Sequence, residues 1–77
     1  MKIIIGNLNI RTTTRQLADL FLSFGPVFKA DIVRDANTGC SRGVGYIEMD
    51  HRSGRIAIQK LNRVLFMNAY MEINEIN

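Results

Sequence analysis

The residues with the clearest chemistry lie in the segment Arg42-Gly43-Val44-Gly45-Tyr46-Ile47-Glu48-Met49. Alternate residues of an extended strand share a side, so Val44 and Tyr46 would lie on one face and Ile47 on the other. A tyrosine ring on a strand surface can stack on a nucleic acid base, because every base has a π-face and stacking needs no hydrogen-bond geometry. The ring of Tyr46 has a second interpretation, as a surface aromatic that packs across the sheet against Ile4.

Strands and helices must position this segment, and the spacing of the hydrophobic residues predicts them. The spacing switches between a period of two and a period of about 3.6 residues, which indicates strands and helices in turn. Turn-forming residues at positions 35–39 predict a hairpin between the two middle strands. The expected order is β-α-β-β-α-β, with strands at residues 3–8, at 27–34, from the turn through Met49, and at 70–76.

The ends of the two predicted helices carry capping residues. Thr13, with Gln16 three residues later, forms a capping box, and Gly25-Pro26 ends this first helix. In the second helix Ser53 is the expected N-cap. Near the end of that helix, Asn62 is expected to adopt a left-handed conformation.

Two short motifs resemble those of the RNA recognition motif family. Residues 42–49 match its eight-residue motif (basic, Gly, aromatic, Gly or Ala, aromatic, aliphatic, any, aromatic) except at Val44 and Met49, where aromatic residues are usual. Residues 3–8 match its six-residue motif of the first strand except at Ile4. The resemblance covers the whole chain, which looks most like the short single-domain members found in bacteria. Further matches are Leu17, Phe21, Phe24-Gly25, Thr38-Gly39, Ala57-Ile58 and Leu61-Asn62.

The resemblance and the order of elements imply the same fold. It is an α+β fold, the ferredoxin-like β-α-β-β-α-β sandwich, in which two helices cover one face of a four-stranded antiparallel sheet. The other face of the sheet stays open. Residues 1–77 are expected to form this one RNA recognition motif domain, because a chain of this length fills a single core.

The resemblance also implies a function, the binding of single-stranded RNA to the open face. The family stacks bases at three motif positions, which are Ile4, Val44 and Tyr46 here. Since only Tyr46 has a ring, we expect modest affinity, because each lost stacking platform costs roughly 1–3 kcal/mol. The residues expected to contact RNA are Tyr46, Ile4, Val44, Asn7, Lys2, Lys29, Arg42 and Asn74.

Strand alternation predicts a balance of charges on the open face. A balanced surface neutralises phosphates poorly, although carboxylates can accept hydrogen bonds from the amino groups of bases. Arg34, beside the hairpin turn, either clamps an RNA backbone or pairs with Asp35 or Glu48. The charged residues expected on this face are Lys2, Lys29 and Arg42 with Asp31, Glu48 and Glu72.

A protein-interaction module is the alternative function, in which the sheet or the surface of the second helix would bind a polypeptide, with weak or no RNA binding. Ile56, Val64 and Leu65 are apolar where the family usually has polar residues, so they could form a patch for a protein partner or a homodimer. Scattered apolar surface residues are also ordinary. The second helix is basic, which fits either a solvated face or a second binding surface; its basic residues are Arg52, Arg55, Lys60 and Arg63.

Other classes of function find little support in the residues. Gly43-Val44-Gly45 leads into a strand rather than a helix, so it does not fit a dinucleotide-binding loop. His51 and Cys40 are each the only residue of their type, which argues against a zinc site. Acidic residues near cations are more often surface ion pairs than acid-base dyads. We therefore expect no enzymatic activity, no cofactor and no metal.

Composition and charge narrow the setting of the protein. The apolar run at residues 3–5 is far too short to span a membrane, so no membrane role is expected. A single cysteine suggests a reducing compartment and a cytoplasmic location. The net charge of +3 suits a polyanionic partner without requiring one.

Overall fold

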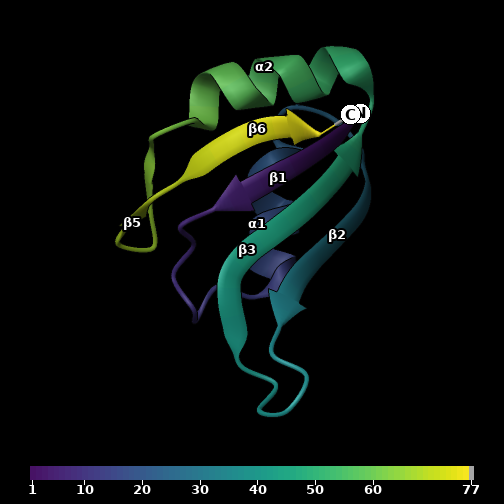
Figure 1. The fold of residues 1–77 in the computed structure, drawn as a ribbon. Helices are drawn as coiled ribbons and strands as arrows, with labels where there is room; N and C mark the ends of the chain where they lie inside the picture. The colour runs from purple at the N-terminus through teal and green to yellow at the C-terminus, as the bar shows by residue number, and fades with distance from the viewer. Residues whose placement is uncertain (77) are drawn as a thin grey trace.

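A four-stranded antiparallel sheet, with strand order β2-β3-β1-β6, carries both helices on one face (Figure 1). The structure is a computed structural model that describes residues 1–76; Asn77, the last residue of the expected domain, lies outside the described residues. The fold is the predicted ferredoxin-like β-α-β-β-α-β arrangement. Its elements are β1 (Lys2–Gly6), α1 (Thr14–Leu22), β2 (Val27–Arg34), β3 (Ser41–Met49), α2 (His51–Leu61) and β6 (Glu72–Ile76), with a small hairpin of β4 (Leu65–Phe66) and β5 (Ala69–Tyr70) before β6.

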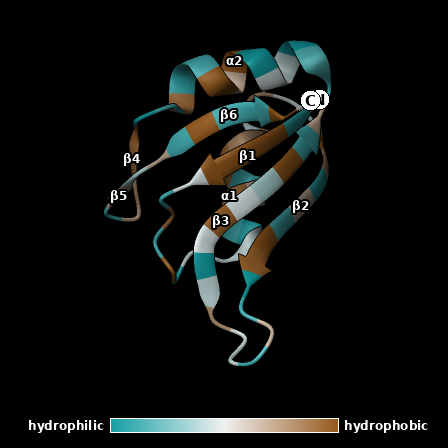
Figure 2. Ribbon diagram, in the orientation of Figure 1, coloured by the Kyte–Doolittle hydropathy of each residue, from teal (hydrophilic) through white to brown (hydrophobic). Residues whose placement is uncertain are grey.

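The core lies between the sheet and the helices. Alternate residues of the central strands point into it, and buried positions accordingly alternate with partly exposed ones along β3. Figure 2 shows hydrophobic positions on each of the strands β1, β2, β3 and β6. Each helix adds a stripe of apolar side chains that covers this face of the sheet. The fully or almost fully buried hydrophobic residues are Ile3, Ile5, Leu8, Leu17, Phe21, Ile47, Met49, Ala57, Leu61, Met71 and Ile73.

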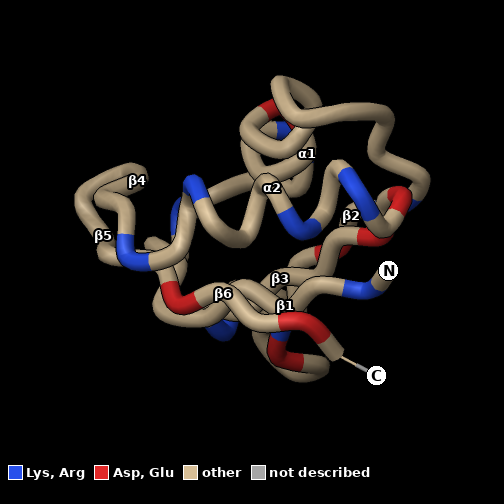
Figure 3. The backbone as a smooth tube through the Cα atoms, turned by 90° about the horizontal axis from the view of Figure 1, so that it is seen from above, with Lys and Arg blue, Asp and Glu red and all other residues tan. Residues whose placement is uncertain are grey.

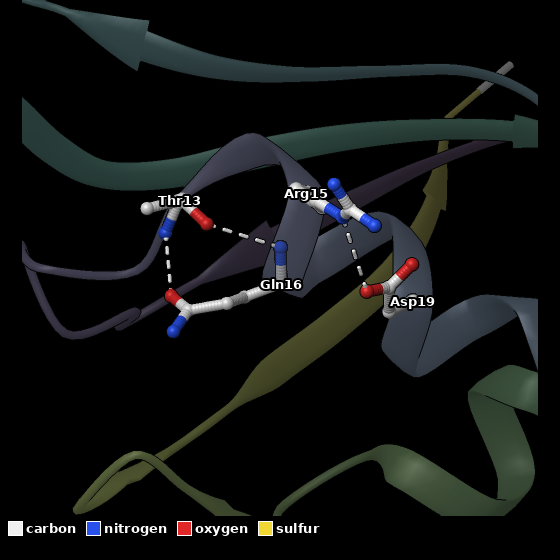
Figure 4. Close-up of polar contacts among 4 residues, drawn as sticks. All are labelled: Thr13, Arg15, Gln16 and Asp19. Carbon is white, nitrogen blue, oxygen red and sulfur yellow. Dashed lines mark hydrogen bonds and ion pairs between the residues drawn. The ribbon is translucent and has the colours of Figure 1, made fainter.

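The predicted capping box begins α1. The Thr13 Oγ1 atom accepts from the Gln16 backbone N–H at 3.1 Å, and the Gln16 Oε1 atom accepts from the Thr13 backbone N–H at 2.9 Å (Figure 4). These two bonds satisfy backbone donors that the first turn of a helix otherwise leaves without partners. Arg15 and Asp19, one turn apart on the exposed side of α1, form an ion pair at 3.8 Å.

Removal of the cap should measurably destabilise the fold. Thr13→Ala should lower the free energy of unfolding by about 1 kcal/mol, because an N-cap side chain is lost. Arg15→Ala is the matched control and should cost no more than about 0.5 kcal/mol, because it removes only an exposed ion pair. Urea unfolding followed by circular dichroism measures both variants. Equal losses in the two variants would contradict a capping role for Thr13.

The ends of α2 differ from the prediction. Asp50, rather than Ser53, is the N-cap: its Oδ1 atom accepts from the Ser53 backbone N–H at 2.9 Å, which starts the helix at His51. This bond holds the pKa of Asp50 below its ordinary value, because it stabilises the charged carboxylate. At the other end Asn62 is extended and Arg63 is left-handed, with φ 66°. Asn62 is extended because its side chain caps the edge of β6, accepting from the Ile73 N–H at 2.9 Å.

The hairpin of β4 and β5 is an element that the spacing of hydrophobic residues does not predict. The expected strand at residues 70–76 is divided, so that Tyr70 belongs to β5 and β6 starts at Glu72. Met67 and Asn68 form the turn with φ 48° and 64°, the pair of positive angles that a tight two-residue hairpin requires. This sequence lacks the Asn-Gly signal that usually marks such turns, so the hairpin goes unnoticed in the sequence.

Candidate nucleic-acid interface

The open face of the sheet brings Tyr46 to the centre of a row of four residues. Strand register places Tyr46 opposite both Asp31 on β2 and Ile4 on β1, and Ile4 opposite Asn74 on β6. Ile4, Val44 and Tyr46 are partly exposed, and Asn74 is exposed. The structure therefore assembles an apolar centre with polar groups at both ends of the row.

A second row carries the charges next to Tyr46. Glu48 on β3 lies opposite both Lys2 on β1 and Lys29 on β2. The Lys2 Nζ atom stands 5.2 Å from the centroid of the Tyr46 ring, within the range of a cation–π contact. The Lys29 Nζ atom forms an exposed ion pair with Asp31 Oδ2 at 3.7 Å. Cations and carboxylates thus alternate across this face. Figure 3 shows both signs of charge along the sheet, and it shows basic positions on α2.

The hairpin turn before β3 is built by Asp35. Its Oδ1 atom accepts from the backbone N–H groups of Asn37 and Thr38 at 2.8 and 3.0 Å. These bonds, with that from Thr38 the stronger influence, hold the pKa of Asp35 below its ordinary value. Arg34 donates to the Gly39 carbonyl oxygen at 3.5 Å. Within residues 1–76 the ion pairs involve other residues, so neither expected partner of Arg34 is paired with it.

The side chain of Asn7 is held by a hydrogen bond, whereas that of Arg42 is solvated. Asn7 follows β1 with φ 56°, and its Nδ2 atom donates to the Tyr70 carbonyl oxygen at 2.8 Å. Its amide nitrogen therefore ties the β4–β5 hairpin to the end of the sheet. Arg42 is exposed at the start of β3, where its side chain is solvated beside the open face.

Two aromatic side chains that the motifs do not include are the most exposed rings on the molecule. Phe28 on β2 is 69% exposed and Tyr70 on β5 is 64% exposed. An aromatic residue in a predicted strand normally belongs to the core, so neither stands out in the sequence. The residues on either side of Phe28 and of Tyr70 carry no turn signal that would predict the irregular backbone by which these rings are exposed.

The surface away from the open face has a groove beside α2. This groove of about 830 Å³ runs between α2 and β6, and it contains the exposed side chain of Ile56. Leu65 lies elsewhere, opposite Tyr70 in the small hairpin. Among residues 1–76, no group of three His, Cys, Asp or Glu side chains could hold a metal ion. In the same part of the chain, no helix has the length and hydrophobicity to cross a membrane.

Comparison with known proteins identifies the family. The family model described as RNA recognition motif matches residues 3–72. This chain belongs to the RNA recognition motif family. Its membership explains the open face, since the two motifs lie on the adjacent central strands β1 and β3.

Individual relatives in the family agree with this assignment. The candidate RNA-binding protein RbpE of Nostoc sp. is 32% identical over 97% of this chain and 77% of its own length. The crystal structure of RNA-binding protein PG1 is 36% identical, with a TM-score of 0.96 over 99% of this chain and 93% of that one. The RNA recognition motif of Rna15, solved with bound RNA (GU), is 27% identical, with a TM-score of 0.84 over 95% and 79% of the two chains. The Nostoc relative fits the predicted likeness to bacterial members.

Proposed function

We propose that this protein binds single-stranded RNA on the open face of its sheet, with Tyr46 as the central stacking platform. The observation that carries the proposal is the partly exposed ring of Tyr46 in the row with Ile4 and Asn74, beside Val44. Ile4 and Val44 would support a base through apolar contact, and the Asn74 amide would bond to base edges. Binding of this kind requires no catalytic group and no cofactor.

Lys2, Lys29 and Arg42 would supply the contacts to phosphate. In the free protein the Lys2 ammonium stands over the Tyr46 ring and Lys29 pairs with Asp31. A base that stacks on the same face of the ring would displace the ammonium, which then can reach a phosphate of the bound strand. The remaining carboxylates on this face weaken the attraction to the backbone, so the affinity is modest.

An amide-shift titration with random single-stranded RNA tests this function. We expect shifts at Ile4, Val44 and Tyr46 at about 50 mM salt that fade at about 200 mM. If all three cations contact phosphates, the dissociation constant should rise about 20-fold between these salt concentrations. A sheet whose amide resonances do not move at the lower salt concentration would rule out the proposal.

A protein partner is the second candidate function, and exposed apolar residues favour it. Ile56, Val64 and Leu65 are 42%, 40% and 52% exposed. The groove beside Ile56 also contains Arg52 and Arg55, so an acidic, partly apolar polypeptide or a second copy of the chain would suit it. Loss of partner binding in Ile56→Asp, with RNA binding absent in the unaltered protein, would favour this function.

The compartment and the domain organisation are inferred from Cys40 and from the single four-stranded sheet. We place the RNA partner in the cytoplasm, since the exposed Cys40 thiol suits a reducing compartment. Residues 1–77 act as one RNA-binding domain. Within residues 1–76, both helices contact a single sheet, which supports this organisation.

A further inference from the structure

We propose that the bound RNA crosses the sheet along a diagonal of three rings, Phe28, Tyr46 and Tyr70, of which the first and last replace the stacking platforms missing at Ile4 and Val44. This inference rests on the RNA binding proposed above and adds two base-stacking residues from outside both family motifs. The ligand class is a run of unpaired nucleobases.

A β-bulge exposes Phe28 at one corner of the sheet. Val27 lies opposite Met49 and Lys29 lies opposite Glu48, so Phe28 is an extra residue on β2 with no partner on β3. Val27 is packed against the core and Lys29 is exposed. The bulge sets Phe28 and Lys29 together opposite Glu48, and the Phe28 ring is 69% exposed beside Lys29.

Alternation along the chain places Tyr70 on the open face at the opposite corner. Tyr70, Glu72 and Asn74 are exposed, whereas the residues between them, Met71 and Ile73, are buried. The burial of the residues in the β4–β5 hairpin also indicates that Tyr70 faces away from the core. Its pair Phe66 and Ala69 is partly buried, with Phe66 packed against the core, and its pair Leu65 and Tyr70 is exposed.

Backbone bonds hold the Tyr70 corner in place. The Asn7 side chain donates to the Tyr70 carbonyl oxygen at 2.8 Å. The neighbouring residue Met71 donates to the Val64 carbonyl oxygen at 3.1 Å and accepts from the Arg63 N–H at 2.8 Å. These bonds fix the backbone that carries the ring, so binding does not have to order the hairpin, which favours affinity.

The bulge, the register of the central strands and the course of the chain before β6 set the three ring residues along one diagonal. From Tyr46, the diagonal moves one strand across and two residues along to Gly6, which lies opposite Glu72 on β6. Tyr70 comes two residues before Glu72, in β5 of the small hairpin, so the chain continues the diagonal beyond the end of β6. The step from Tyr46 to Gly6 is about 8 Å, and the step from Tyr46 to Phe28 in the opposite direction is about 10 Å, from the usual strand spacing and rise. Gly6 has no side chain, so nothing on β1 obstructs a strand of RNA between the two tyrosines.

A carboxylate borders the middle of this diagonal, where it favours contact with bases over contact with phosphates. A Cβ atom placed on Gly6 would lie 3.9 Å from the Glu72 Oε2 atom, so this carboxylate borders the path at its midpoint. Carboxylates accept hydrogen bonds from base amino groups and repel phosphates. The bases therefore face the sheet, and the phosphates face outward, where Lys2, Lys29 and Arg42 can reach them.

The experiment measures the affinity of the full chain for an oligouridylate of about 10 nucleotides, a length within the range of single-stranded sites. Phe28→Leu and Tyr70→Leu should each weaken binding about 5- to 150-fold, as expected for the loss of one stacked base. Phe28→Tyr and Tyr70→Phe keep a ring and should bind like the unaltered protein. Leu22→Ala is the matched control, because Leu22 is exposed on α1, away from the open face.

Tyrosine emission reports stacking at Tyr70 directly. The chain has two tyrosines and no tryptophan, so in Tyr46→Phe the emission comes from Tyr70 alone. We expect the oligouridylate to quench it with the same midpoint as binding. Binding with unquenched Tyr70 emission, or with unchanged affinity in both leucine variants, would overturn the diagonal while leaving RNA binding intact. No binding by the unaltered protein would overturn both proposals.

Discussion

Tyr46→Ala should weaken RNA binding about 5- to 150-fold while the fold is kept. The substitution removes the central ring of the open face, and one stacked base contributes roughly 1–3 kcal/mol. The fold should survive because Tyr46 is only partly buried, and its neighbours Ile47 and Gly45 on the core side are unchanged. Anisotropy of a labelled single-stranded RNA measures the affinity, and circular dichroism checks the fold.

Tyr46→Phe separates stacking from other roles of this side chain. It keeps the ring and the contact with the Lys2 ammonium and loses only the hydroxyl group, so its affinity should remain close to that of the unaltered protein. If the alanine variant bound RNA as well as the phenylalanine variant, stacking on Tyr46 would not contribute to affinity. The surface around Ile56 would then become the better candidate for a functional site.

Gly43→Ala should produce the largest loss of stability among the substitutions considered. Backbone strain alone costs about 1–3 kcal/mol, and a close contact adds to this cost. Gly43 has φ 73°, a conformation that strains every residue with a Cβ atom. A Cβ atom there would also lie 2.9 Å from the Leu8 carbonyl oxygen. This backbone atom cannot easily move, because the Leu8 N–H donates to the Gly43 carbonyl oxygen at 2.9 Å. Denaturant unfolding measures the loss.

Gly39→Ala distinguishes the two causes. Gly39 has φ 75°, but a Cβ atom there would meet no atom within 4 Å. Gly39→Ala should therefore cost only the backbone strain, about 1–2 kcal/mol. An equal loss of stability in the two variants would show that contact with Leu8 is not the reason for glycine at position 43. A larger loss in Gly43→Ala supports the close approach of the two backbone segments.

Much of the fold could be predicted from local features of the sequence. The order of strands and helices follows from hydrophobic periods that a single element imposes on its own residues. The capping box of Thr13 and Gln16 was predicted correctly because both its bonds lie within four residues of chain. The outward direction of Tyr46 was predicted from the resemblance to the family motif, and β3 alternates without interruption from Gly43 to Met49.

The two errors at the ends of α2 have different causes. Two candidate N-cap residues compete at its start, and a hydrogen bond to β6 changes its end. Asp50 and Ser53 are both good N-cap residues, three positions apart, and the sequence alone does not show which one begins the helix. Asp50 does so because its carboxylate accepts from Ser53 itself. Asn62 was expected to be left-handed, but its side chain bonds to Ile73, eleven residues away on β6, and Arg63 takes the left-handed conformation instead.

The wider surface around Tyr46 was decided by contacts between distant segments. A bulge exists only when two strands pair, so the exposure of Phe28 depends on the register between β2 and β3. Tyr70 reaches the open face because the turn at Met67 and Asn68 and the bond from Asn7 position the small hairpin. Sequence by itself determined the order of elements and the motif strands, because these follow from short-range periodicity, and the resemblance to the family motif indicated the direction of Tyr46. Tertiary structure decided which other rings share that face, because strand register and long-range hydrogen bonds join residues that no local pattern relates.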